Sequence, residues 1–312
     1  MSRRVLTIFG TTIITAIIIV GIYWRNTTEI PAAPNPKQAT ATTPRDNATP
    51  APPPYRAPST TDPKLSALVN RDLNANERVS GDISAQIPRV VNPNDLDALV
   101  SVLMDTKDND SVRNEVANLL RRSHYPGLPD ALIKVLDNPA EGSRFRAFAT
   151  QHLGDLAKDA PPDSELRETS ITKFQLALDD RHFTVRAQAL QNLCRLKDAK
   201  GRETAIHWLT NYKPCAPETD GKPADPELER GSILNIAIRC CKDLDLKDQI
   251  PTIRQYSRDD NEVVRIAAIV ALSDWRDEES RRTFEEAAKS SNVRLQHCGQ
   301  AALKRLDTAP HP

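Results

Sequence analysis

From about residue 92 onward, apolar residues recur with the period of an amphipathic helix, in units that read helix, short turn, helix. The turns carry Asp, Asn, Pro or Gly at the positions where helix caps belong. We therefore predict six helical hairpins, with five as the alternative because the repeats are degenerate. The first helices are predicted at 94–104, 129–136, 165–178, 202–212, 250–256 and 278–288. The second helices are predicted at 112–122, 144–156, 184–196, 227–242, 262–274 and 293–306.

Several second helices open with a shared motif, which is most complete from Val264 to Leu272, Val-Arg-Ile-Ala-Ala-Ile-Val-Ala-Leu. Counting its Val as zero, positions 0, +4, +7, +8 and +11 fall within one stripe of a helix, which is filled by Val, Ala, Leu and Ile. The arginine of the motif recurs at 113, 146, 186, 265 and 294, with a weaker match at 230, in steps of 33, 40, 44, 35 and 29 residues. Such periods predict a solenoid, in which a hairpin buries its apolar stripe only by stacking on its neighbours.

This motif resembles that of the HEAT-repeat family, including its bacterial phycobilisome-lyase-like branch. The resemblance implies an all-α fold, a right-handed α-α superhelix of five to six stacked hairpins. In that family an Asp six residues before the motif arginine often joins a ladder between repeats. Asp180 and Asp259 fit this spacing, whereas Lys107, Ala140 and Ala288 do not. Half of the ladder is therefore expected to be missing.

Composition and charge narrow the class of partner. Hydrophobic residues make up 39% of the chain but aromatic residues only 4%, with 10 glycines, which favours helices packed through Ala and Leu. The 42 basic residues equal the 42 acidic ones, and without the first 63 residues the remainder has a net charge of −3. A nucleic-acid partner would require clustered positive charge. We expect no nucleic-acid partner.

The N-terminus contains an apolar run of 20 residues, Val5 to Trp24, without a charged residue. At about 1.5 Å per residue it spans the roughly 30 Å hydrocarbon core of a bilayer. Two arginines precede the run and one follows it, which predicts a single-pass transmembrane signal-anchor helix with a cytoplasmic N-terminus and an extracytoplasmic repeat domain. A cleaved signal peptide is the alternative, which the length of the run and the lack of an Ala-x-Ala site disfavour.

The predicted organisation follows from these segments. Residues 1–4 are the cytoplasmic N-terminus and 5–24 the anchor, and residues 25–63 form a disordered linker because Pro, Ala and Thr leave little to bury. Residues 64–91 are a candidate capping segment, 92–306 the repeat domain and 307–312 a disordered tail. In a bacterium with two membranes the extracytoplasmic side is the periplasm.

Catalytic motifs are not evident in the sequence. Among the six histidines, only His152 is followed by a carboxylate at helical ligand spacing, Asp155, and the His-Glu dipeptides of the HEAT-like iron hydroxylases are lacking. Gly-rich phosphate loops and a Gly-x-Ser-x-Gly elbow are also lacking. We expect no catalytic residue, metal, cofactor or small-molecule substrate. The family resemblance leaves one alternative, a lyase or cofactor-loading enzyme of the phycobilisome-lyase-like type.

Five cysteines lie in the repeat region, and an oxidising compartment would favour pairing some of them. Cys194 and the Cys240–Cys241 pair lie near the C-terminal ends of adjacent second helices, which are parallel in a solenoid. Cys215 lies in the long loop between them and could reach either. These four residues are candidates for a disulfide, and free thiols are the equal alternative.

A partner protein or peptide is expected on the concave side, which the second helices of HEAT-like hairpins line. Positions +2, +5, +6 and +9 from the motif Val point away from the core stripe. We predict that this surface changes from polar to apolar along the repeats, with burial of the apolar part by its neighbours as the alternative. The predicted partner-binding residues are Asn114, Asn118, Arg121, Thr150, Gln151, Leu190, Gln191, Leu234, Asn235, Ile238, Ile266 and Ile269.

Overall fold

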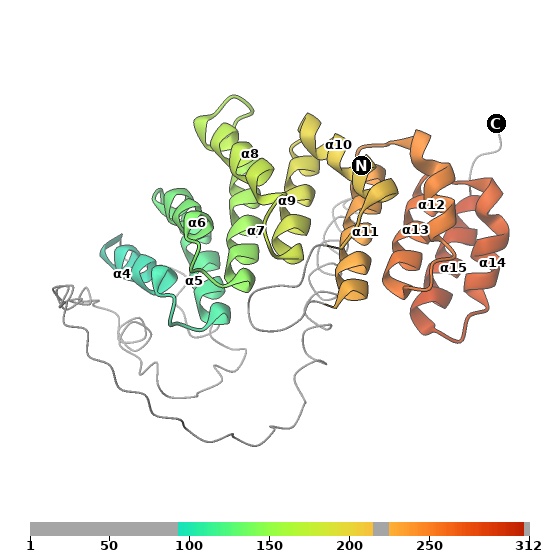
Figure 1. Ribbon diagram of the computed structural model, residues 1–312, viewed down its shortest axis with the longest axis horizontal. Coiled ribbons are helices and arrows are strands. Elements are labelled where there is room, and N and C mark those ends of the chain that lie inside the picture. The colour runs from blue at the N-terminus through green and yellow to red at the C-terminus, as the bar shows by residue number, and fades with distance from the viewer. Residues whose placement is uncertain (1–92, 215–224, 309–312) are drawn as a thin grey trace, which may run out of the picture. The chain divides into compact units, whose positions relative to one another are not determined.

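The computed structural model describes residues 93–214 and 225–308, and within these ranges the chain is helical, without a strand. The all-α prediction is confirmed, and six hairpins follow one another (Figure 1). The first-row helices are α4 (Pro93–Met104), α6 (Leu128–Asp137), α8 (Glu165–Ala177), α10 (Ala199–Asn211), α12 (Ile250–Tyr256) and α14 (Arg281–Ala288). The second-row helices are α5 (Asp110–Arg122), α7 (Ser143–Asp159), α9 (Phe183–Arg195), α11 (Pro226–Asp243), α13 (Glu262–Asp274) and α15 (Val293–Asp307). Short 3-10 turns, η1 (Lys247–Gln249) and η2 (Glu278–Ser280), lead into α12 and α14.

Polar caps fix where most second-row helices begin. The side-chain oxygens of Asn109, Asn261 and Asn292 accept hydrogen bonds from backbone N–H groups in the first turns of α5, α13 and α15. Asp225 does the same at the start of α11. These side chains satisfy donors that have no partner inside the helix, which makes the start of each helix a single defined residue.

Four second-row helices end in a left-handed residue that is not glycine. His124, Lys197, Asp245 and Arg276 follow α5, α9, α11 and α13 with φ values between 51° and 59°. The next N–H after each of them returns to a carbonyl of the last helical turn, as in Tyr125 N to Leu120 O at 3.0 Å. Each of these four turns, which join one hairpin to the next, therefore satisfies helix carbonyls at the expense of a strained backbone conformation.

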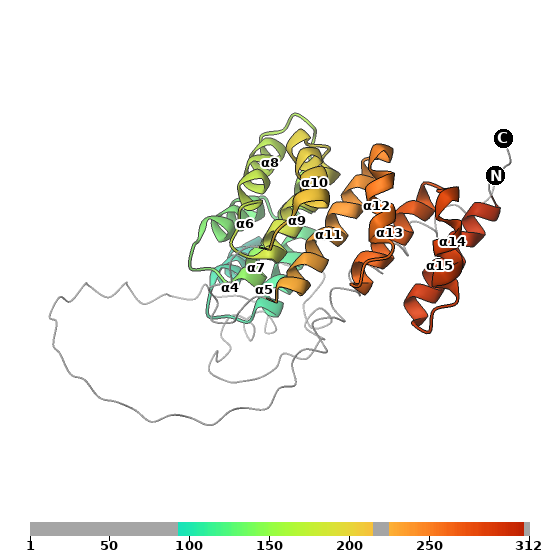
Figure 2. The same cartoon turned by 45° about the vertical axis from the view of Figure 1, so that its right-hand side comes forward.

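The core lies between the two rows of helices and continues from one hairpin to the next. Its fully buried side chains come from both rows, for example Leu99 and Leu132 in the first row and Leu120 and Leu193 in the second. A second view shows the hairpins stacked one after another, from α4 and α5 to α14 and α15 (Figure 2). One apolar layer thus runs through the stack, as expected of hairpins that cannot bury their stripes alone.

The predicted anchor, linker and capping segment lie outside the described residues, as do Cys215 and residues 309–312. The last helix, α15, extends to Asp307, one residue beyond the predicted end of the repeats. Between residues 93 and 308, where the structure describes the chain, no helix is both long enough and apolar enough to cross a membrane.

Candidate binding surface

The second-row helices form one continuous layer. Each contacts the next, from α5 and α7 through to α13 and α15. Extensive contacts within the first row are confined to α4 with α6 and α6 with α8. In a curved stack, the row whose helices contact one another along its whole length lies on the inside. The exposed stripe of the second-row helices is therefore called the inner face.

Seven of the twelve predicted partner-binding residues lie on this inner face. They are partly exposed, and they are Asn114, Asn118, Arg121, Gln151, Gln191, Asn235 and Ile266. The other five are in the interior, with at most 3% of each exposed, and they are Thr150, Leu190, Leu234, Ile238 and Ile269. Those five residues pack helix against helix, so the inner face lacks the broad apolar half that the sequence suggested.

The position along the motif explains which residues are exposed. The +5 residues point sideways into the neighbouring second-row helix, as Leu190 and Leu234 do. The +6 residues, rotated by about 100° from them, remain partly exposed at Gln191 and Asn235. Each of α7, α9, α11 and α13 touches its first-row partner and two second-row neighbours, and only a narrow stripe is left for solvent.

Arginine–carboxylate rungs join successive second-row helices. The Arg113 guanidinium donates to both carboxylate oxygens of Glu141 at 2.8 and 2.6 Å and packs over the Phe145 ring. Arg146 donates to Asp180 at 2.9 Å. Further along, Arg186 donates to Glu229 at 2.6 Å, and Arg230 to Asp259 at 3.1 and 2.5 Å. Four consecutive pairs therefore set the spacing of five inner helices.

The ladder is fuller than the expected half. Asp180 and Asp259 are rungs, Glu141 makes a rung next to Ala140, where counting six residues back had found no Asp, and Glu229 makes a fourth rung that the count did not include. Glu141 stands five residues before Arg146, and Glu229 lies inside α11, next to Arg230. Whether a carboxylate pairs with the arginine depends on how far its side chain reaches, and not on a fixed number of residues before the next motif arginine.

A second polar network joins α5, α7 and α9. His152 Nε2 lies 2.8 Å from the Asn114 side-chain oxygen, and Asn192 donates to the Thr150 carbonyl at 2.8 Å. Asn192 approaches so closely that a Cβ on Gly154 would lie 2.2 Å from its side-chain oxygen. These amides are used inside the stack, whereas sequence reasoning placed Asn114 among the partner-binding residues and did not single out Asn192.

His152 is uncharged in this network. Burial, followed by the positive charge of Arg121, lowers the pKa of His152 to about 4, although Asp155 opposes the shift. Asp155 itself lies between two arginines, 3.6 Å from Arg121 and 3.1 Å from Arg195. With Nε2 protonated towards Asn114, Nδ1 has no hydrogen-bond partner among the described residues.

The cysteine candidates meet at the contact of α9 with α11. Cys194, Cys240 and Cys241 are buried and present as free thiols. A hydrogen bond with Cys194, followed by burial, raises the pKa of the Cys240 thiol, and burial raises that of Cys241 to about 12. Cys194 and Cys240 are thus neighbours, while Cys215 is outside the described residues, and the disulfide stays a prediction.

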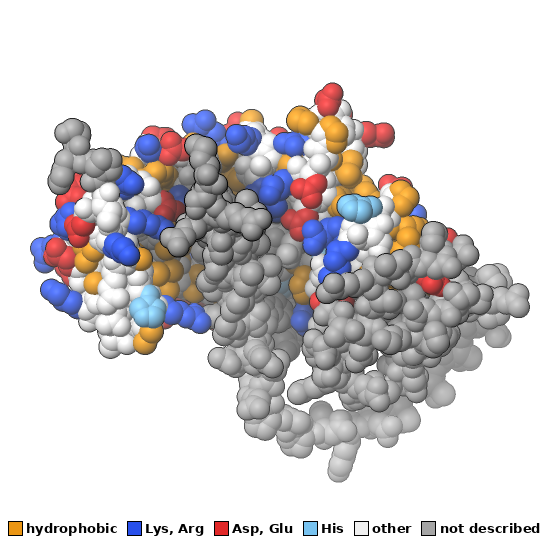
Figure 3. Space-filling model, turned by 180° about the vertical axis from the view of Figure 1, so that it is seen from behind, with side chains coloured by type: hydrophobic (Ala, Val, Ile, Leu, Met, Phe, Trp, Pro, Cys, Tyr) orange, Lys and Arg blue, Asp and Glu red, His pale blue; other side chains and the backbone are white. Residues whose placement is uncertain are grey.

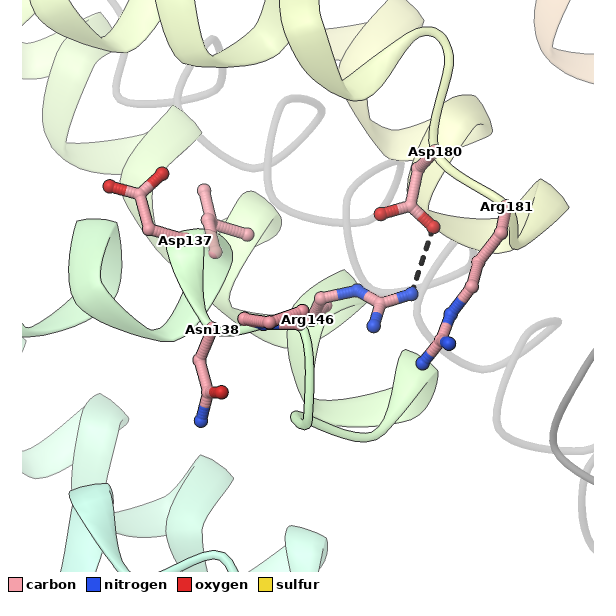
Figure 4. Close-up of a pocket in the computed structure, with 7 residues that line it drawn as sticks. Asp137, Asn138, Arg146, Asp180 and Arg181 are labelled. Atoms are coloured by element: carbon pink, nitrogen blue, oxygen red, sulfur yellow. Dashed lines mark hydrogen bonds and ion pairs between the residues drawn. The ribbon is translucent and has the colours of Figure 1, made fainter.

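A cleft of about 310 Å³ opens beside the second rung, between the end of α6 and the start of α7. Its charged lining includes Asp137, Arg146, Asp180 and Arg181, and Figure 4 shows the Arg146 guanidinium directed at Asp180 with Arg181 beside it. Arg146 also donates to the Glu141 carbonyl at 2.7 Å, and Asp137 is paired with Lys173 at 2.6 Å. The cleft is a gap between structural ion pairs.

No known family model matches the sequence, and no curated protein matches it. Among solved structures, the complex of CpcE and CpcF of phycocyanin lyase from Nostoc sp. PCC7120 is similar, with 20% identity and a TM-score of 0.45 over 68% of this chain and 76% of that one. A designed armadillo repeat protein in complex with the peptide (KR)4 is 15% identical, with a TM-score of 0.41 over 68% of this chain and 99% of the other. The described part of this chain has a HEAT-like repeat fold.

Proposed function

We propose that this chain is a membrane-anchored, extracytoplasmic scaffold that holds a partner protein or peptide on the inner face of its repeats. One observation supports the proposal above all. The inner face crosses every second-row helix and carries partly exposed side chains, such as Asn118, Gln151 and Gln191, that make no hydrogen bond to the described residues. The polar stripe on α5, α7, α9 and α11 suits capture of one partner along its length.

The chain acts by binding and not by catalysis. Most of its well-buried carboxylates are paired with arginines, as Glu141 is with Arg113 and Glu229 with Arg186, which fits a role in spacing the helices. Among the described residues, no three of His, Cys, Asp and Glu are grouped to hold a metal ion. The net charge of −3 beyond residue 63 and the mixture of basic and acidic side chains in Figure 3 support a protein partner over a nucleic acid.

The anchor and linker complete the proposal. An uncharged run at 5–24 would fix the chain in the bilayer, and a Pro-rich linker at 25–63 would hold the repeats away from it. A reporter fused to the C-terminus tests this topology, with activity expected from a reporter that works only outside the cytoplasm. Activity from a cytoplasmic reporter instead would contradict the membrane part of the proposal.

Site-specific photo-crosslinking tests the binding part. A photoreactive residue replaces Gln151 on the inner face or, as the matched control, Gln255 on the exposed side of α12, in the full chain in its own cells. A discrete adduct from position 151 and none from 255 is the expected result. Equal adducts at both positions, or none at 151, would contradict binding on the inner face.

A further inference from the structure

One row of the inner face consists of side-chain amides. It occupies the position five residues after the rung arginine in four successive second-row helices, and its members are Asn118, Gln151, Gln191 and Asn235. Because alternate helices of the stack are parallel, equivalent positions lie side by side. The row is followed on α13 by Val270, which is also partly exposed.

These amides differ from four asparagines of the second row. Asn114 and Asn192 are bonded within the stack, and Asn261 and Asn292 cap helices. The four amides of the row, by contrast, have no hydrogen bond to any residue that the structure describes. Each carboxamide therefore offers donors and acceptors to whatever covers it.

The row is uncharged where charge would be usual. Exposed first-row positions carry ionised groups such as Glu168, Glu203 and Glu285, in keeping with the 27% of charged residues in the chain. Covering an ionised group removes much of its hydration, whereas covering an amide that finds a partner costs far less. Four uncharged polar groups in succession suit a surface that is covered by a polar ligand.

The spacing of the row and the hydrogen-bonding groups of its amides both fit an extended polypeptide as the ligand. Packed helices lie about 8–10 Å apart, which is roughly three residues of extended chain at about 3.3 Å each. An extended segment has unpaired N–H and C=O groups along its length, and a carboxamide can donate to one and accept from the other. Four row positions would then follow roughly nine residues of the segment.

The edge of the row adds a charge preference. The last five residues of α5, α7, α9 and α11 form a basic edge beside it, with the basic residues Arg121, Arg122, Lys158, Arg195, Arg239 and Lys242 against the acidic residues Asp155, Asp159 and Asp243. Asp155 is shared between Arg121 and Arg195, and the edge has a net charge of +3 although the region beyond residue 63 is acidic overall. Acidic side chains on the bound segment would complement this edge.

We propose that the inner face binds an extended, acidic polypeptide segment through its main chain, by hydrogen bonds to Asn118, Gln151, Gln191 and Asn235. This inference rests on the proposed scaffold function and names the class of partner. The segment is recognised mainly by its backbone. Its side chains matter at two places, which are the basic edge and the apolar position next to Val270.

The probe for this proposal is a displayed library of random twelve-residue peptides, panned on the full chain in detergent micelles. The selected peptide is then synthesised, and its affinity is measured by fluorescence anisotropy for the full chain and its variants. Selected peptides are expected to be acidic. Gln191→Ala and Asn235→Ala should each weaken binding about fivefold, since each removes hydrogen bonds to the segment.

Two controls separate recognition of the main chain from other effects. Gln255→Ala, a change of the same kind on α12, should leave the affinity unchanged, and circular dichroism should show all variants folded. N-methylation of alternate backbone amides of the peptide should abolish binding while leaving its side chains intact. A selected peptide insensitive to N-methylation or to the row variants would overturn the proposal, as would a library that yields no binder.

The experiments distinguish failure of extended-peptide recognition from failure of the proposed scaffold function. A crosslinked partner at position 151 whose capture does not depend on Gln191 or Asn235 would leave the scaffold standing and overturn extended-peptide recognition. Loss of both the crosslink and the peptide would overturn both.

Discussion

The two ends of the repeat stack hold their helices together in different ways. Near the N-terminal end, α5, α7 and α9 are joined by buried rungs, where the side chains of Arg113 and Glu141 are 1% and 3% exposed, and by the network around His152. Near the C-terminal end, the Arg230 side chain of the last rung is 32% exposed, and Arg265 makes no rung to α15 within the described residues. There, α13 and α15 are joined by the exposed ion pair of Arg305 with Asp274 and by a hydrogen bond from Asn292 to Glu262, and α14 and α15 by close backbone packing at Gly299.

This difference indicates that the two ends fix the relative positions of their helices in different ways. Buried pairs contribute little net stability but penalise any shift that separates them, so they fix the register of the N-terminal hairpins. Apolar packing tolerates small shifts better and depends on volume and shape. We expect substitutions of a rung partner to be severe at the N-terminal end and mild at the C-terminal end.

The largest expected effect is at the first rung. Glu141→Ala leaves the Arg113 guanidinium buried without its carboxylate and should lower the free energy of unfolding by about 3–5 kcal/mol. Asp259→Ala, the matched change at the exposed rung, should cost about 1 kcal/mol or less. Urea unfolding followed by circular dichroism gives both values.

A double variant provides the control for the rung. Arg113→Met with Glu141→Leu removes both charges and should recover most of the stability lost in Glu141→Ala, because no charge remains buried. Similar losses for Glu141→Ala and Asp259→Ala would contradict the proposed difference between the two ends.

At the C-terminal end, the most sensitive position should be Gly299 on α15. A Cβ there would lie 2.3 Å from the Ala288 backbone nitrogen and 2.6 Å from the Phe284 carbonyl oxygen, and backbone atoms cannot move aside as a side chain can. Gly299→Ala should therefore destabilise the protein by about 3 kcal/mol in urea unfolding. Gly142→Ala, where a Cβ has open space, is the control and should change stability by only a few tenths of a kcal/mol.

The sequence predicted the helices better than it predicted the surface. The bounds of α13, at 262–274, follow from the motif Val, the cap Asn261 and the period of apolar residues, all of which are local. The inner face depends on how far each helix is rotated about its axis against three neighbours. That rotation separates Ile269, which is buried, from Val270, which is partly exposed, and no local pattern contains it.

Two of the four rungs were missed for a related reason. Glu229 lies within α11 and Glu141 in a loop, and both reach an arginine of the preceding repeat. Their partners are 43 and 28 residues away, so the pairing depends on the stacking of the hairpins and not on the motif. Similarly, the contact between His152 and Asn114 could not be inferred before α5 and α7 were placed together.

Acidification should test the N-terminal network. The pKa of His152 is about 4 in the folded chain, below its unfolded value of about 6.5, so the unfolded state binds its proton first. The corresponding stability is fully present above pH 6.5 and is lost as the pH falls towards 4, by about 2 kcal/mol between pH 7 and pH 5. His152→Gln should lose about that much less over the same interval in parallel urea titrations. Identical pH profiles for both proteins would mean that His152 is not held neutral.

The smallest expected effect is common to both ends and shows what the hairpins share. Lys197 after α9 and Arg276 after α13 adopt φ values of 59° and 55°, which cost a residue with a Cβ about 1 kcal/mol and glycine very little. Lys197→Gly and Arg276→Gly should each stabilise the protein by about 0.5 kcal/mol, because the greater freedom of glycine in the unfolded chain offsets part of the gain. Lys197→Ala and Arg276→Ala remove the charge but keep the strain and should give no gain. Equal gains at the two positions would place the difference between the ends in the side-chain contacts between hairpins and not in the turns that join them, whereas a gain at one position alone would mean that the turns differ as well.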